Sequence, residues 1–420
     1  MPKGTVLFTS RAPIGYVAIA DREIATNQGF RSFVCEGGIW PQYVYFYMKT
    51  MKPLAEQMAS GTTFLEISGT KAGELPIVIP PFNEQKRIAA KLESLLSKAE
   101  ACRQRLDTIP VILKRFRQSV LIAACSGSLT AEWREQYPDL ESARGIIAKA
   151  QGARLLAAVK PTHRQHIEEV FAIQEQQDSD DLPESWQYVA LAKLCESFQY
   201  GTSSKSAKTG NVPVLRMGNI QNGEIDWSDL VFTSDEDEIQ KYRLTPNSVL
   251  FNRTNSPELV GKTAIYRGER PAIFAGYLIK VNHRPELDPE YLNYCLNTTY
   301  AREFCQSVKT DGVSQSNINA QKLARFEVPF CPLAEQQEIV RRVDALFKVA
   351  DGIEARYNKA RIHTDRLTQS ILAKAFRGEL VPQDPNDEPA EKLLQRIRST
   401  REANGKSLQI ASKRRKAAQT

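Results

Sequence analysis

Polar side chains that suit nucleic-acid recognition gather in the loops of the second half of the sequence. Arginine can read guanine with two hydrogen bonds, asparagine and glutamine can read adenine, and lysine, serine and threonine suit phosphate. The candidates in this half are Thr202, Lys205, Lys208, Arg216, Asn219, Asn252, Arg253, Lys262, Gln315 and Asn317. Loops near the start of the chain add Ser10, Arg11, Thr62 and Thr63. We therefore expect a DNA-binding surface, with ordinary loop polarity as the alternative explanation.

The candidates in the second half predict two separable roles. Arg216, Asn219 and Arg253 lie beside strand-like segments, which would hold them on a rigid platform within reach of base edges. The three lysines suit phosphate contacts, which position a protein on DNA without reading its sequence. The alternative is that Arg216 or Arg253 anchors its own domain through a buried carboxylate.

No catalytic or metal-binding motif accompanies these loops. Residues 404–407 end like a phosphate-binding loop, but Thr400 stands where that motif needs its first glycine. The sequence has no H-E-x-x-H or G-x-S-x-G motif, and its four histidines are dispersed. Its seven cysteines include no C-x-x-C pair, which argues against a zinc site and suits a reducing compartment. We expect a binding protein with no cofactor of its own.

A repeated helical pattern must position these loops. From Ile88 to Val120, apolar residues recur at alternating steps of four and three, the seam of a helix packed against another helix. Nine of the ten positions 251 residues later can pack in the same way, and Thr364 is the polar exception. The flanks repeat at the same offset, because Glu84-Gln85 matches Glu335-Gln336. The chain therefore carries one long helix twice.

The length of this helix predicts its partner. A helix from Glu84 to Ser126 would be roughly 65 Å long and would expose its seam unless another helix lay alongside. Its own repeat, running antiparallel, would bury both seams; two unrelated helices in a bundle are the alternative. Proline at position 110 is expected to kink the first copy, and Gly352 to weaken the second. The seam residues expected to be buried are Leu95, Leu106, Leu346 and Ile353.

These patterns predict an α+β fold, in which two mixed α/β domains are separated by two long antiparallel coiled-coil helices in a pseudo-two-fold repeat. The expected segments are a first globular domain at 1–81, a helix at 82–127, a connector at 128–181, a second globular domain at 182–332, a helix at 333–378, and a short helix with a basic tail at 379–420. Further expectations are strands at Thr5–Phe8, Leu75–Ile79 and Phe326–Phe330, helices at Trp40–Met58 and Glu290–Ser307, and a solvated linker at 174–181.

The composition sets outer limits. With 420 residues the chain is long enough for two or three domains, and a net charge of +7 permits a nucleic-acid partner without requiring one. The sequence shows no signal peptide and no apolar run of membrane length. We expect a cytoplasmic protein without a membrane partner.

Several motifs in order resemble one family, the specificity subunits of Type I restriction-modification systems. The motifs that carry the resemblance are Leu7–Gly15, Leu75–Ile88, Gly127–Trp133, Leu182–Trp186, Arg216–Ile220, Ala334–Ile339 and Phe376–Leu380. The resemblance implies two target-recognition domains, each reading one half of a bipartite double-stranded DNA sequence, with the paired helices as a spacer. It also implies docking of two DNA-methyltransferase subunits and, through them, restriction/translocase subunits. S-adenosylmethionine, ATP and magnesium are then expected on those partners.

The sequence departs from the family pattern at its start. Val6-Leu7-Phe8 matches Val249-Leu250-Phe251, but the block Leu182–Ser248 before the second match has no counterpart in the first domain. We therefore expect an N-terminally incomplete first domain, through a mis-assigned start, a natural truncation or a degraded gene. The competing functions are a self-contained methyltransferase or nuclease, an inactive truncated subunit, and a structural coiled-coil adaptor.

Overall fold

The computed structural model describes the chain except residues 12, 62–63, 177–179, 401 and 403–420. It divides into two compact units, each with its own core. Unit 1 comprises Met1–Ile109 with Ala355–Thr420, and unit 2 comprises Pro110–Glu354. The expected basic tail and the Asn404–Ser407 segment lie outside the described residues.

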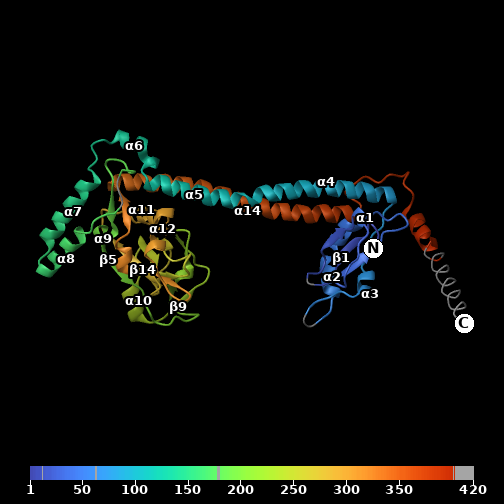
Figure 1. Ribbon diagram of the computed structural model, residues 1–420, viewed down its shortest axis with the longest axis horizontal. Coiled ribbons are helices and arrows are strands. Elements are labelled where there is room, and N and C mark those ends of the chain that lie inside the picture. The colour runs from blue at the N-terminus through green and yellow to red at the C-terminus, as the bar shows by residue number, and fades with distance from the viewer. Residues whose placement is uncertain (12, 62–63, 177–179, 401, 403–420) are drawn as a thin grey trace. The chain divides into compact units, whose positions relative to one another are not determined.

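Unit 1 contains a three-stranded antiparallel sheet in the order β2-β1-β3 (Figure 1). Its elements before the long helix are β1 Val6–Thr9, β2 Val17–Ile19, β3 Phe30–Phe33, α1 Pro41–Thr50, α2 Lys52–Met58 and α3 Gly69–Gly73. Phe8, Tyr43 and Ile67 are fully buried between the sheet and these helices. The predicted helix at Trp40–Met58 is two helices, because Met51 ends the first and Pro53 opens the second.

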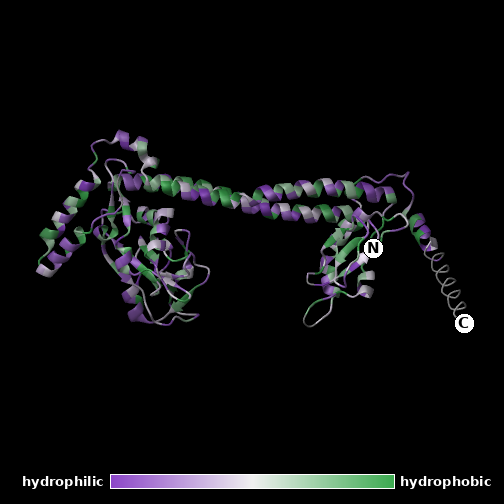
Figure 2. Ribbon diagram, in the orientation of Figure 1, coloured by the Kyte–Doolittle hydropathy of each residue, from purple (hydrophilic) through white to green (hydrophobic). Residues whose placement is uncertain are grey.

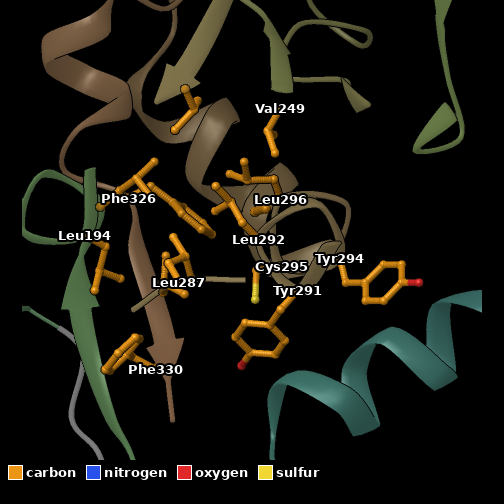
Figure 3. Packing of buried hydrophobic residues seen from close by; sticks show 14 of the residues in the cluster. Leu194, Val249, Leu287, Tyr291, Leu292, Tyr294, Cys295, Leu296, Phe326 and Phe330 are labelled. Atoms are coloured by element: carbon orange, nitrogen blue, oxygen red, sulfur yellow. The ribbon is translucent and has the colours of Figure 1, made fainter. Parts of the chain in front are cut away.

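Unit 2 is built on a four-stranded antiparallel sheet in the order β12-β10-β14-β5. Its other strands form smaller sheets, and α11 packs on the core (Figure 3), where Leu287, Leu292 and Phe326 gather. The strands are β4 Gln187–Ala190, β5 Cys195–Tyr200, β6 Val212–Leu215, β7 Ile220–Gln221, β8 Glu224–Ile225, β9 Val231–Thr233, β10 Ser248–Asn252, β11 Thr254–Asn255, β12 Thr263–Tyr266, β13 Ile273–Phe274, β14 Leu278–His283, β15 Thr310–Asp311, β16 Ser316–Asn317 and β17 Glu327–Phe330. The helices are α6 Ala131–Gln136, α7 Ala143–Ala157, α8 Pro161–Phe171, α9 Leu191–Leu194, α10 Glu236–Tyr242, α11 Pro289–Leu296, α12 Thr299–Val308 and α13 Ala320–Leu323, with short 3-10 turns at Ser128–Thr130 and Met217–Asn219.

The long helices run antiparallel within each unit, as predicted. They are α4 Phe82–Asp107, α5 Ile109–Cys125 and α14 Leu333–Phe376. In unit 1, Leu92 packs in one core with Ile371, while Asp107 pairs with Arg361. In unit 2, α5 lies along the first part of α14, where Arg117 pairs with Asp351 at 2.7 Å (Figure 1). Residue numbers therefore rise along one helix as they fall along the other.

The first long helix is interrupted, and the second is continuous. α4 ends at Asp107 with Thr108 as its C-cap, and α5 begins at Ile109, next to Pro110, whose missing N–H and ring break the hydrogen-bond ladder. The predicted kink is therefore a one-residue interruption at Thr108, which keeps αR dihedral angles. Gly352, by contrast, lies inside the unbroken α14.

Burial of the seam is uneven, and part of that prediction was wrong. Leu95, Leu106 and Leu346 are only half-buried, and Ile353 is 42% exposed. The physical reason is that each helix in this region packs against one other helix of the described chain, so only one of its faces is covered. Thr364, expected to be the polar misfit, is buried, and its hydroxyl donates to the carbonyl four residues earlier at 2.9 Å.

The same hydrogen-bond pattern is found at the N-terminus of both long helices. In unit 1 the Gln85 amide donates to Pro80 O at 2.9 Å and accepts a backbone N–H at 2.8 Å. In unit 2 the Gln336 amide donates to Cys331 O at 2.7 Å and accepts a backbone N–H at 2.7 Å. The repeat in the sequence is therefore also a repeat in the structure.

Three further expectations are corrected. The strand predicted at Leu75–Ile79 is absent, whereas its counterpart Phe326–Phe330 forms β17. The helix predicted at Glu290–Ser307 is split into α11 and α12 by the cap at Thr298. The segment 174–181 is not simply solvated, because Glu175 accepts from the buried Lys193 Nζ at 2.7 Å.

Candidate DNA-recognition surface

Four segments of unit 2 meet around the turn formed by Ala275 and Gly276. The N–H of Ala275 donates at 2.9 Å to the carbonyl directly before Arg216. The N–H of Gly276 donates to Thr202 O at 2.7 Å, and Arg253 Nη1 donates to Gly276 O at 3.2 Å. Residues far apart in sequence are thereby brought to one place.

Gly201 permits the close approach at this turn. A Cβ atom at position 201 would lie 2.3 Å from Phe274 O and 2.5 Å from Ala275 O. Because those atoms are backbone, they cannot move aside as a flexible side chain would. Glycine is therefore required by space here, which the sequence alone did not reveal.

Arg253 is the most completely held of the candidate base readers. It lies between β10 and β11, and its guanidinium stacks over the Tyr200 ring at 4.9 Å. Its Nη2 donates to Asn317 Oδ1 at 3.1 Å, and Asn317 Nδ2 donates to Thr254 Oγ1 at 2.8 Å. The structure brings the predicted Arg253 and Asn317 together. Both the oxygen and the nitrogen of the Asn317 side-chain amide, however, are hydrogen-bonded within the protein.

The fourth segment is the hairpin formed by β15 and β16, which Asn317 joins to Arg253. Its tip is closed by Gly312 N donating to Gln315 O at 2.8 Å, and the side chains of Val313 and Gln315 are exposed there. Lys322, which the sequence did not single out, donates to Thr310 Oγ1 at 2.6 Å and holds the hairpin base. Gln315 thus stands free on a supported tip.

Asn219 is not a base reader in this structure. It is 3% exposed, its Nδ2 donates to the carbonyls of Asp226 and Asp229 at 2.9 Å each, and its Oδ1 accepts from Arg216 N at 2.8 Å. The side chain holds the turn after β6. Arg216 itself pairs with Asp229 at 3.1 Å, but that carboxylate is 90% exposed rather than buried, so the anchoring role considered above is weak.

Three other candidates are also buried. Thr202 Oγ1 accepts from Ser204 N at 3.0 Å, and Ser10 Oγ in unit 1 donates to Gln28 O at 3.3 Å. The amide of Asn252 is fully buried, and no described residue hydrogen-bonds it. Because none of these side chains reaches the surface, their assignment to DNA contact is corrected.

The lysines differ in accessibility. Lys205 and Lys208 are exposed on the loop after β5. Lys262 is half-buried, and its Nζ donates to Gln221 Oε1 at 3.0 Å. Burial and the nearby Arg302 lower the pKa of Lys262. The two loop lysines are therefore the better placed for phosphate.

In unit 1, two arginines lie around Glu66. The backbone of Arg11 bridges to Glu66, and the Arg11 side chain is exposed. The sequence reasoning missed Arg31, which pairs with Glu66 at 2.8 Å and donates to Ile67 O at 3.2 Å. A lone arginine in the strand-like run of β3 was the available signal. Thr62 and Thr63 lie outside the described residues.

The described part of the chain contains no group of three or more His, Cys, Asp or Glu side chains placed to hold a metal ion. Among its helices, none is long and apolar enough to cross a membrane.

The comparisons with known proteins agree on one family. A family model described as the Type I restriction modification DNA specificity domain matches residues 1–110 and 183–362. The EcoKI specificity subunit of Escherichia coli K12 is 30% identical over 83% of this chain and 68% of the relative. The StySPI specificity subunit of Salmonella potsdam is 28% identical over 87% of this chain and 73% of the relative.

Solved structures show the same fold. The HsdS subunit from Thermoanaerobacter tengcongensis superposes with a TM-score of 0.52 at 18% identity, covering 90% of this chain and 82% of that one. A chain from a study of type I R-M complex assembly and conformational transition gives a TM-score of 0.63 at 19% identity, covering 90% and 83%. The family match and the EcoKI likeness place this chain in the family of Type I restriction-modification DNA specificity subunits.

Proposed function

We propose that unit 2 reads one half of a bipartite DNA target through the surface around Ala275 and Gly276, and that unit 1 reads the other half. The observation that carries this proposal is the convergence there of Arg216, Arg253 and the Gln315 hairpin. Each presents a side chain suited to base edges, held by hydrogen bonds or by a backbone turn. Pre-positioned side chains lose little freedom on binding.

The same proposal assigns phosphate contacts to Lys205 and Lys208, which are exposed on the loop after β5. We propose that the chain supplies no catalysis and binds no cofactor. S-adenosylmethionine, ATP and magnesium would then be held by partner subunits. Its cysteines are free where the structure describes them, which suits action in the cytoplasm.

The modification subunits are proposed to dock on the helix pair of unit 2, and the restriction subunits to join through them. The helix α5 is rich in hydrophobic residues (Figure 2). Its Val111, Ile112 and Ile122 are exposed, as are Val349 and Ile353 of α14. Exposed apolar patches of this kind commonly mark protein interfaces.

Introducing a negative charge into this apolar patch tests the docking. Ile112→Asp should abolish co-purification with the modification subunit, because a buried unpaired carboxylate is costly. Leu156→Asp is the matched control, since Leu156 on α7 is exposed outside the helix pair. Equal retention of the partner by both variants would remove the patch from the interface.

A methyl-transfer assay tests whether catalysis belongs to the modification subunit and not to this chain. The rigorously purified chain should transfer no methyl group from S-adenosylmethionine and cut no DNA. Methylation should appear only when the modification subunit is added. Methyl transfer by the chain alone would favour the self-contained methyltransferase instead.

A further inference from the structure

The hairpin of β15 and β16 in unit 2 is held at its base from two sides. Strand β16 is the centre of a three-stranded sheet, in which Asn317 pairs with Thr254 of β11 and with Thr310 of β15. Lys322 Nζ donates to Val308 O at 2.5 Å, directly before the hairpin. These contacts hold the tip of the hairpin at a fixed place on the unit.

The tip, residues 312–315, carries an apolar side chain that no described neighbour covers. Val313 has a relative exposure of 109%, and it stands two residues before the exposed Gln315. An apolar side chain in water contributes nothing to the packing of its own domain, and burying it elsewhere is favourable. A contact made by the tip would therefore gain free energy from Val313.

Unit 1 contains the same hairpin arrangement. Glu66 matches Asn317 at the offset of 251, and it also lies between two antiparallel partners, Ser60 and Arg11. Arg11 in turn matches Thr254, at the offset of 243 that relates the preceding strands of the two units. The repeat therefore includes the three-stranded support of the tip.

The residues after each hairpin anchor it in the same way. Ile67 and Ile318 are equivalent, and both are fully buried. The equivalent lysines, Lys71 and Lys322, each donate from Nζ to a backbone carbonyl just before the hairpin; for Lys71 the acceptor is Met58 O at 2.8 Å. The base of the hairpin is thus built alike in both units.

The apolar character of the exposed part is repeated with different residues. Phe64, which stands at the position of Gln315, is 69% exposed, and the adjacent Leu65 is 52% exposed. The two hairpins therefore share their supports and differ in the side chains that they expose. This combination is expected of elements that contact different DNA sequences from equivalent platforms.

The chemistry of the major groove indicates what an apolar tip can recognise. Hydrogen-bond donors and acceptors line most of the base edges there, and the C5 methyl group of thymine is the characteristic apolar group. The groove is wide enough to admit a two-stranded β-ribbon such as this hairpin. Arg253, a candidate base reader, is hydrogen-bonded to the hairpin through Asn317.

We propose that Val313 contacts the C5 methyl group of a thymine in the half-site that unit 2 reads, and so determines specificity at that base pair. The proposal rests on the DNA-reading function proposed above and adds an apolar contact to it. The methyl groups of Val313 exclude water from the thymine methyl, which favours thymine over cytosine or uracil. Gln315, at the same tip, is left to hydrogen-bond a neighbouring base edge.

Replacing thymine by deoxyuridine tests this contact, because it removes the methyl group and leaves base pairing intact. The chain assembled with its modification subunit is measured on its mapped target, with each thymine of both half-sites replaced in turn. The wild-type complex should lose about fourfold in affinity at one position. Val313→Ala should bind the thymine target about fourfold more weakly and should lose nothing further with uracil there.

A second valine provides the matched control. Val159 is 94% exposed in unit 2, outside the hairpin, so Val159→Ala should respond to uracil as the wild type does. Thermal melts of Val313→Ala should match those of the wild type, because a fully exposed side chain away from structural features has little effect on stability. A change in DNA affinity would then reflect the contact and not the folding of unit 2.

The results that would overturn the inference are distinct. They are a target without thymine in either half-site, no uracil effect in the wild type, or a uracil effect of equal size in Val313→Ala. Loss of the modification subunit by Val313→Ala with unchanged base preference would assign the tip to a protein contact, and would overturn it equally. Failure of the DNA-reading proposal itself would instead appear as an unchanged preference profile in Arg253→Ala, Arg216→Ala and Gln315→Ala.

Discussion

Replacing Glu335 by glutamine is expected to destabilise unit 2 strongly. The Glu335 carboxylate is fully buried and accepts from Thr130, Trp186 and Arg134, with 2.8 Å between Arg134 Nη2 and Glu335 Oε1. Breaking a buried ion pair on one side typically costs about 3–5 kcal/mol. The Arg134 side chain is 21% exposed, so water relieves part of this, and we expect about 2–4 kcal/mol.

The assay must resolve one unit from the other, because a two-unit chain is not a two-state system. Hydrogen exchange in urea, read on peptides that cover β4 and β17, reports unit 2. Glu84→Gln is the matched control, because the Glu84 carboxylate lies at the equivalent position without described hydrogen bonds. In this variant the unfolding free energy of unit 1, read from hydrogen exchange, should rise or should change by less than about 1 kcal/mol. Equal losses for the two variants would refute the reasoning.

Three further substitutions test separate parts of the structure. Gly201→Ala should lower the melting temperature of unit 2 and loosen exchange at the turn, with an overpacking cost of about 1–3 kcal/mol; unchanged melting would contradict it. Leu106→Ala should cost less than the roughly 2–5 kcal/mol of a buried leucine, because Leu106 is half-buried; a larger loss in urea unfolding would mean tighter packing. Hydrogen bonds from Arg341 and Arg342 lower the pKa of Glu338 to about 2, so its stabilisation is present above about pH 4.3 and lost as pH falls towards 2. Glu338→Gln should flatten that part of the acid unfolding curve, and an unchanged curve would refute the assignment.

The long helices were predictable because their signal is local and repeated. Each seam position carries its own side chain at a helical spacing, and the matching flanks at Gln85 and Gln336 proved to make the same hydrogen bonds. The exposure of Ile353 was not predictable, because a seam pattern says which face is apolar and not how much of it is covered.

The strand expected at Leu75–Ile79 failed for a different reason. Its sequence is as strand-like as that of β17, but a strand exists only where another strand pairs with it. Strand propensity therefore located the segment equivalent to β17, but whether it forms a strand depends on a pairing partner elsewhere in the chain.

The candidate recognition residues fall into buried and exposed groups, depending on whether the side chain hydrogen-bonds the nearby backbone. Short polar side chains such as those of Asn219 and Thr202 bond the nearby backbone, which fixes turns and removes them from the surface. The longer side chain of Lys205 extends into solvent from its loop, whereas that of Lys262 bonds Gln221 and is half-buried. The convergence around Ala275 and Gly276 required the three-dimensional structure, because no sequence spacing indicates it.

Base preference of the assembled complex tests the central claim most directly. With the target identified by mapping methylated sites, binding of the chain with its modification subunit is measured on every single-base variant, at several salt concentrations and alongside thermal melts. Arg253→Ala should lose about 1–3 kcal/mol on the cognate site and relax one base position. Lys205→Ala should weaken cognate and random DNA alike and lower the salt slope by about one. An unchanged preference profile in folded Arg253→Ala, Arg216→Ala and Gln315→Ala variants would contradict the account.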